Sequence, residues 1–76
     1  MTEVPIHTGQ IKLDAFLKFC MACETGGEAK VMIQEGYVAV NGEICVQRGR
    51  KLVPGDVVSL DDGTSFEVVK VEAEAN

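Results

Sequence analysis

The chain has 76 residues and a formal net charge of −5 at pH 7, and 46% of its residues are hydrophobic. A chain of this length forms one domain, buries only about 60% of its unfolded surface, and has no room for a deep substrate cleft beside its scaffold. No apolar run approaches the ~18 residues of a membrane-spanning helix, and the N-terminus lacks the pattern of a signal peptide. We therefore predict a cytoplasmic location and no membrane partner.

A leader and an amphipathic helix are predicted for the start of the chain. Residues 1–9 show no periodic pattern and contain a proline and a glycine, so we expect a leader that includes a short extended piece at residues 4–6. The following apolar residues have the i, i+3, i+4, i+7 spacing of one helix face. These residues are Leu13, Phe16, Leu17 and Cys20.

A second helix is predicted over residues 26–35. Thr25 and Glu28 have the spacing of a capping box, in which each side chain satisfies a backbone N–H group at the start of the helix. Gly36 is expected to end the helix, because a left-handed residue is favoured there. The two predicted helices are joined by only a few residues, so we expect them to pack against each other.

After the second helix the hydrophobic period changes to two, which is typical of strands. The sequence Asn41-Gly42 indicates a type I′ hairpin turn, and the turn signals at residues 54–56 and 61–63 separate the later strands. The predicted strands are residues 37–40, 43–46, 57–60 and 65–71.

The predicted fold class is α+β, with two packed N-terminal helices followed by a small, mostly antiparallel sheet of four to five short strands. We expect a single domain over residues 10–71. The acidic tail at residues 72–76 is expected to fray.

Positive charge is concentrated in one short segment of this acidic chain. Residues 10–55 hold six basic and five acidic residues, whereas residues 56–76 hold six acidic residues and one lysine. Arg48, Arg50 and Lys51 lie within four positions of one another. Exposed charges more than about 10 Å apart are largely screened at ordinary salt, so this cluster can attract a polyanion despite the net charge. The alternative interpretation is an ordinary solvated loop.

Three cysteines form no complete disulfide framework. Cys20 and Cys23 have C-x-x-C spacing but fall in a helical pattern, and no second close pair completes the four ligands of a structural zinc site. Cys45 and His7 are the other candidate ligands. We favour small buried hydrophobes as the interpretation of the cysteines. No catalytic constellation is evident, and the sequence predicts no enzyme, no cofactor and no metal.

Short motifs follow one another in a fixed order over about 45 residues: Lys12-Leu13-Asp14, Glu28-Ala29-Lys30, Gly36, Asn41-Gly42 and Pro54-Gly55-Asp56. This order resembles the S4-type RNA-binding domain, which is named after the ribosomal small-subunit protein and also occurs in pseudouridine synthases and tyrosyl-tRNA synthetases. Within this family, the chain is most similar to the small stand-alone YaaA-like and YbcJ-like bacterial proteins. The similar segments are LDAFLK, ETGGEAK, VNGE and the basic segment 46–52. The resemblance implies an RNA-binding module without a catalytic domain.

The chain departs from the family pattern on the second helix. The family carries an arginine where this chain has Gly26, and often two successive basic residues where this chain has Lys30-Val31. The resemblance therefore implies a different set of phosphate contacts. The expected RNA-binding residues are Lys12, Gly26, Gly27, Lys30, Arg48, Arg50 and Lys51.

The two glycines are expected to act through their backbone N–H groups at a helix N-terminus. Their alternative role is only to permit a tight start of the helix. Tyr37 is the one aromatic ring expected to be exposed, so structured RNA fits better than stacked single strands. Ribosomal RNA and tRNA are the candidate ligands, and we expect a monomer. The alternative function is a protein-interaction module that uses Val31 and the basic loop and has lost much of its RNA affinity.

Overall fold

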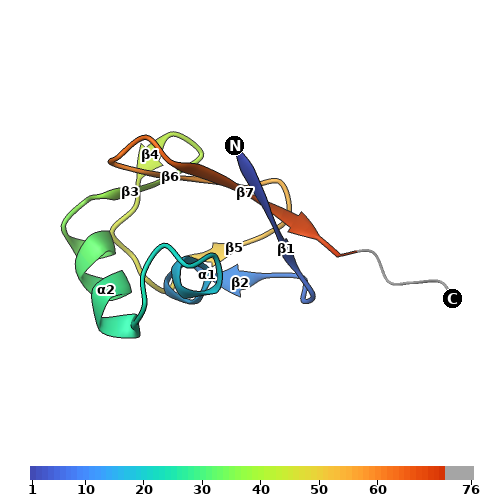
Figure 1. Cartoon of the computed structure of the whole chain (residues 1–76), viewed down its shortest axis with the longest axis horizontal. Coiled ribbons are helices and arrows are strands. Elements are labelled where there is room, and N and C mark those ends of the chain that lie inside the picture. Colours follow the sequence, from blue (N-terminus) through green and yellow to red (C-terminus); the bar gives the residue numbers. More distant parts are fainter. Residues whose placement is uncertain (72–76) are drawn as a thin grey trace, which may run out of the picture.

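The computed structural model describes residues 1–71, and the expected tail at residues 72–76 lies outside this range. In the described part, a five-stranded sheet covers a second layer made of two helices and a two-stranded ribbon (Figure 1). In chain order the elements are β1 (Thr2–Ile6), β2 (Ile11–Lys12), α1 (Leu13–Phe19), α2 (Gly26–Gln34), β3 (Val38–Val40), β4 (Glu43–Ile44), β5 (Lys51–Leu52), β6 (Val57–Leu60) and β7 (Ser65–Lys70).

The strand order of the large sheet is β1-β7-β6-β3-β4. The β6–β7, β3–β6 and β3–β4 pairs are antiparallel, and β1 runs parallel to β7. The small ribbon pairs β2 with β5 in antiparallel fashion. The predicted α+β class and the mostly antiparallel sheet are confirmed.

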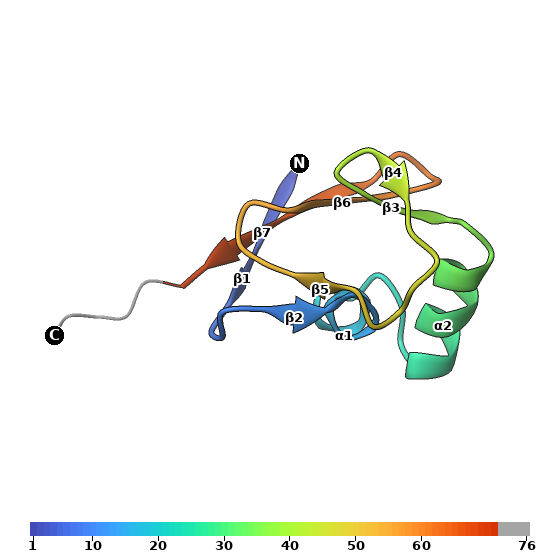
Figure 2. The same cartoon turned by 180° about the vertical axis from the view of Figure 1, so that it is seen from behind.

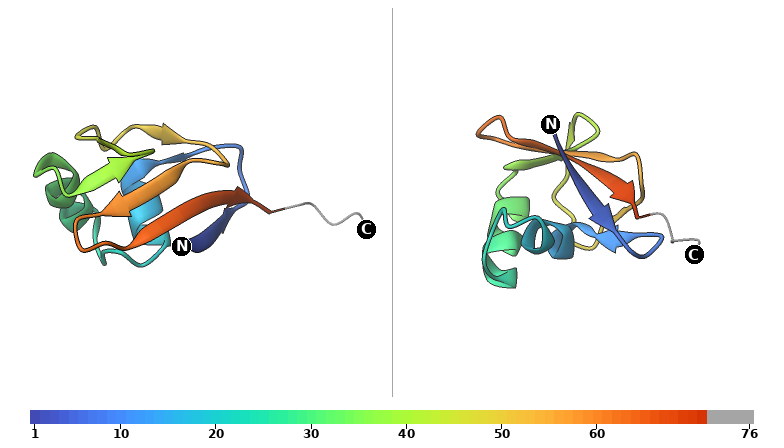
Figure 3. Two further views of the ribbon diagram at one scale, coloured as in Figure 1. Left: turned by 90° about the horizontal axis from the view of Figure 1, so that it is seen from above. Right: turned by 45° about the vertical axis from the view of Figure 1, so that its right-hand side comes forward.

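The predicted order of the elements is wrong, because two strands precede the helices. The segment expected to be a leader contains β1, which lies beside β7 at the edge of the sheet (Figure 3). Val4 and Ile6 are buried, so the boundary expected at residue 10 does not separate this strand from the sheet. Pro5 obscured the strand in the sequence, since proline cannot donate a ladder hydrogen bond and is tolerated mainly in edge strands.

The core lies between the sheet and the helical layer. Ring centroids of Phe16 on α1 and Phe66 on β7 are 6.3 Å apart at an interplanar angle of 80°, an edge-to-face contact that joins the two layers. Phe16 is fully buried, and the other fully buried large side chains are Leu13, Leu17, Ile33, Val38, Val40, Leu52, Val58 and Val68. Among residues 1–71, no helix is long and apolar enough to cross a membrane.

Hydrogen bonds of two side chains, Asn41 and Asp56, connect the β3–β4 turn to the start of β6. Asn41 has φ 53° and Gly42 has φ 89°, as the predicted type I′ turn requires. The Asn41 Oδ1 atom accepts a hydrogen bond from the Val57 amide at 2.9 Å, and Asn41 Nδ2 donates to Asp56 Oδ1 at 3.0 Å. Asp56 Oδ2 in turn accepts from the Val53 amide at 3.0 Å. These two motif residues, which we call the Asn41–Asp56 bracket, therefore have a structural role.

The two helices end in the same motif with different residues. At the end of α2, Gly36 has φ 82° and the Tyr37 amide donates to the Met32 carbonyl at 3.0 Å. At the end of α1, Met21 has φ 65° and the Ala22 amide donates to the Leu17 carbonyl at 2.9 Å. Both are Schellman motifs, in which the left-handed position favours glycine. The methionine therefore occupies a strained backbone position.

Replacing Met21 by glycine is expected to raise the free energy of unfolding by about 0.5–1 kcal/mol. A left-handed conformation disfavours an L-residue by roughly 1–2 kcal/mol, which exceeds the ~0.4–1 kcal/mol of unfolded-chain entropy that glycine adds. The Met21 side chain is 85% exposed and has little burial to lose. Urea denaturation measures the change, and Gly36→Ala should have the opposite sign. A lower midpoint for Met21→Gly would contradict this account.

Replacing Asn41 by alanine is expected to lower the free energy of unfolding by about 1–3 kcal/mol, because two hydrogen bonds are lost and alanine disfavours a positive φ. Urea denaturation again provides the measurement. Asn41→Gly is the matched control, since it removes the side-chain bonds but accepts the backbone conformation. If Asn41→Gly is as stable as the natural chain, the bracket does not stabilise the fold.

Candidate nucleic-acid interface

The cluster of basic residues lies on an ordered turn. We call residues 47–51 the basic turn. The Arg50 amide donates to the Gln47 carbonyl at 3.1 Å, which closes a β-turn with Arg48 and Gly49 at its centre. Arg48, Arg50 and Lys51 are all exposed. The hydrogen bonds that fix the turn are made by its backbone. Its charged side chains therefore extend from an ordered backbone.

The basic turn also caps helix α1. The N-cap residue of this helix is Lys12, whose side chain makes no capping hydrogen bond. Instead, the Leu13 amide donates to the Arg50 carbonyl at 2.8 Å, and the Asp14 amide donates to the Arg48 carbonyl at 3.1 Å. Distant backbone carbonyls therefore satisfy N–H groups that a helix start leaves unpaired. Figure 2 shows the chain between β4 and β5 passing the start of α1.

The β2–β5 ribbon brings Lys12 into the same surface. Lys12 lies directly opposite Lys51, and Ile11 lies opposite Leu52. The Leu52 side chain is fully buried, whereas both lysines are exposed. The structure thus gathers four of the predicted residues around the start of α1. These residues are Lys12, Arg48, Arg50 and Lys51.

The remaining three predicted residues lie on α2. Gly26, Gly27 and Lys30 are exposed in its first two turns. The predicted capping box is half formed: Thr25 Oγ1 accepts from the Glu28 amide at 3.1 Å, but the Glu28 carboxylate does not bond to the Thr25 amide. Glu28 Oε1 accepts from the Glu24 amide at 2.8 Å, so a carboxylate also occupies this end of the helix. An anion at the two glycine amides therefore has to compete with that carboxylate.

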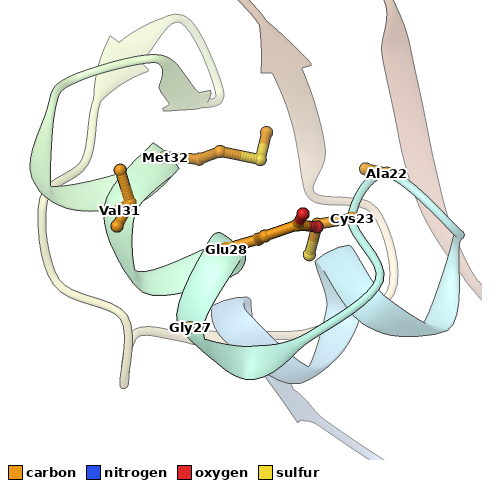
Figure 4. Close-up of a pocket in the computed structure, with 6 residues that line it drawn as sticks. All are labelled: Ala22, Cys23, Gly27, Glu28, Val31 and Met32. Atoms are coloured by element: carbon orange, nitrogen blue, oxygen red, sulfur yellow. The ribbon is translucent and has the colours of Figure 1, made fainter.

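A pocket of about 410 Å³ lies against the same end of α2. Figure 4 shows Cys23, Glu28 and Met32 around the space between α2 and the preceding loop. Its lining is mainly apolar, and its one charged side chain is a carboxylate. Such a pocket does not suit a phosphate.

An exposed aromatic ring was missed by the sequence analysis. Phe19 is 51% exposed, compared with 45% for Tyr37. Phe19 ends α1, whereas the basic turn lies at the start of that helix. The four clustered basic residues therefore have no stacking ring beside them on α1.

The cysteines show the features of packing residues. Cys23 and Cys45 are buried, Cys20 is half-buried, and all three are free thiols. Burial raises the pKa of both Cys20 and Cys23, and the negative charge of Glu28 adds to the effect at Cys23. A raised thiol pKa disfavours the reactive thiolate. Within residues 1–71, no three His, Cys, Asp or Glu side chains form a group that could hold a metal ion.

Comparison with known proteins gives the following relatives. The S4 domain family model matches residues 4–69, so the match begins within β1. The probable ribosome maturation protein RlbA of Bacillus subtilis (strain 168) is 44% identical over 66 residues, which are 87% of this chain and 93% of that protein.

Two solved structures share the fold. The solution structure of YbcJ from E. coli, described as revealing an ALFAL motif involved in RNA-binding, has a TM-score of 0.69 and 33% identity over 91% of this chain and 87% of YbcJ. A crystal structure of pseudouridylate synthase has a TM-score of 0.63 and 25% identity over 68% of this chain, and the chain spans only 22% of that enzyme. The resemblance seen in the sequence is confirmed, and the chain belongs to the S4 domain family.

Proposed function

We propose that this protein binds structured RNA, mainly through phosphates, and has no catalytic activity. The observation that carries the proposal is the gathering of Lys12, Arg48, Arg50 and Lys51 around the start of α1. Membership of the S4 family and the similarity to YbcJ, a protein described as RNA-binding, support the same function. The similarity to a probable ribosome maturation protein favours ribosomal RNA over tRNA as the ligand.

The geometry suits contact with a sugar–phosphate backbone. A guanidinium group can bind one phosphate through two parallel hydrogen bonds, whereas a lysine ammonium acts as a point charge. Because the backbone of the basic turn is held by α1, little ordering is needed when its arginines engage RNA. The lack of a stacking ring beside the cluster on α1 favours recognition of a folded RNA by its shape over recognition of single strands.

We infer that the protein acts as a cytoplasmic monomer. Its likeness to pseudouridylate synthase covers only 22% of that enzyme, so this likeness gives no support for catalytic activity.

The alternative function is protein interaction, and one observation favours it. Val31 is 56% exposed and lines the apolar pocket on α2. Capture of a protein partner that survives nuclease treatment and is lost in Val31→Asp would support this alternative.

Replacing Arg50 by alanine is expected to weaken RNA binding and to lower the slope of log affinity against log salt by about one unit, because one phosphate contact is lost. The carbonyl that caps α1 remains in this variant, so the helix start is preserved. Fluorescence anisotropy with an RNA hairpin and a matched DNA duplex, each at several salt concentrations, measures both quantities. Lys70→Ala on β7 is the matched control. An unchanged slope for Arg50→Ala would argue against a phosphate contact.

Replacing Gly26 by arginine is expected to increase RNA affinity and to steepen the salt slope by about one unit, because a further phosphate contact becomes available. A Cβ atom at Gly26 would meet no atom within 4 Å, and the backbone there is not left-handed. The arginine therefore fits without strain at the position where the family carries one. The same anisotropy titration gives the answer. Unchanged affinity would show that the start of α2 does not face the RNA.

A further inference from the structure

Two lysines face each other across the β2–β5 ribbon. Lys12 and Lys51 are paired in register, so their side chains leave the ribbon on the same face. The adjacent hydrogen bond from the Leu13 amide to the Arg50 carbonyl identifies them as a non-hydrogen-bonded pair. This is the closer of the two antiparallel arrangements, with Cβ atoms roughly 4.5–5.5 Å apart. Like charges in this position destabilise a strand pair.

The repulsion acts on a very short element. The ribbon contains only two residue pairs, and burial of Leu52 opposite Ile11 holds the other pair in place. The acid that follows the ribbon is Asp14, whose Oδ1 atom accepts a hydrogen bond from the Ala15 amide at 2.7 Å within α1. This carboxylate is therefore engaged at the start of its own helix. An external anion between the two ammonium groups would relieve the repulsion.

We propose that Lys12 and Lys51 form a single clamp for one RNA phosphate, and that the bound phosphate stabilises the β2–β5 ribbon. This inference rests on the proposed function. It adds that the two lysines share one phosphate and that binding is coupled to local stability. The coupling reaches α1 directly, because the Leu13 amide that bonds to the Arg50 carbonyl immediately follows the ribbon. The basic turn is thus held more firmly when RNA is bound.

A double-mutant cycle tests whether one phosphate is shared. Lys12→Gln, Lys51→Gln and the double variant are titrated with a synthetic RNA hairpin by fluorescence anisotropy at several salt concentrations. A shared phosphate predicts that the double variant binds little more weakly than either single variant, with the salt slope lowered by about one unit in total. Independent contacts predict that the fold-losses multiply and the slope falls by about two units, which would overturn the clamp but leave RNA binding intact.

The natural chain is the reference for the proposed function itself. If it does not bind the hairpin at low salt, RNA binding fails as the function, and the clamp fails with it. If it binds and the losses multiply, only the clamp fails.

Thermal unfolding of the free protein tests the repulsion. Lys51→Gln is expected to raise Tm by about 1–4 °C at low salt, because the like-charge pair is removed. The gain should disappear at high salt, where the charges are screened. The matched control is Lys70→Gln, which makes the same change in net charge at a strand lysine that lies opposite Ile6 and not opposite a cation. A Tm for Lys51→Gln that is equal to or below that of the natural chain would overturn the proposed coupling.

Discussion

Two backbone hydrogen bonds at the start of α1 determine the arrangement of the candidate site. Lys12 supplies no side-chain cap, so the helix depends on the carbonyl groups of Arg48 and Arg50 to satisfy its first amides. This requirement places the basic turn against the helix and aligns β5 with β2. The same contact therefore stabilises a helix of seven residues and fixes the backbone positions from which the two arginine side chains extend. The fold and the site cannot vary independently here, because a change in the path of the turn would remove the cap.

Local signals in the sequence were sufficient to predict both helices and four of the five strands of the large sheet. The Thr25 cap of α2 and the Asn41-Gly42 turn each depend on residues a few positions apart, and both are present. The missed features are non-local. The strand β1 is held by a parallel partner more than 60 residues away, and Pro5 interrupts its pattern. The strand β5 has only two residues, too few to show a period, so the proximity of Lys12 to Lys51 could not be inferred.

The distribution of charge is compatible with the proposed RNA-binding surface on an acidic chain. Several acids lie in the sheet layer, where Glu3 is paired directly with Glu67 across β1 and β7. The four clustered basic residues lie in the other layer, on the β2–β5 ribbon and the basic turn (Figure 1). The helical layer also carries acids, among them Asp14 and Glu28, so the positive charge is local to the ribbon and the basic turn. A polyanion is attracted to this cluster and repelled by the acids of the sheet layer, which favours one orientation of approach.

The small number of basic residues limits how the protein can achieve affinity. The proposed clamp and the two arginines would neutralise about three phosphates, fewer than the six to ten contacts of a strongly salt-dependent nucleic-acid binder. Counterion release alone therefore supplies little binding free energy. The rest of the binding free energy has to come from a small loss of conformational entropy on binding and from shape complementarity to a folded RNA. A turn that is fixed by its backbone to a helix meets the first condition. An RNA whose phosphates are already positioned by its own structure meets the second.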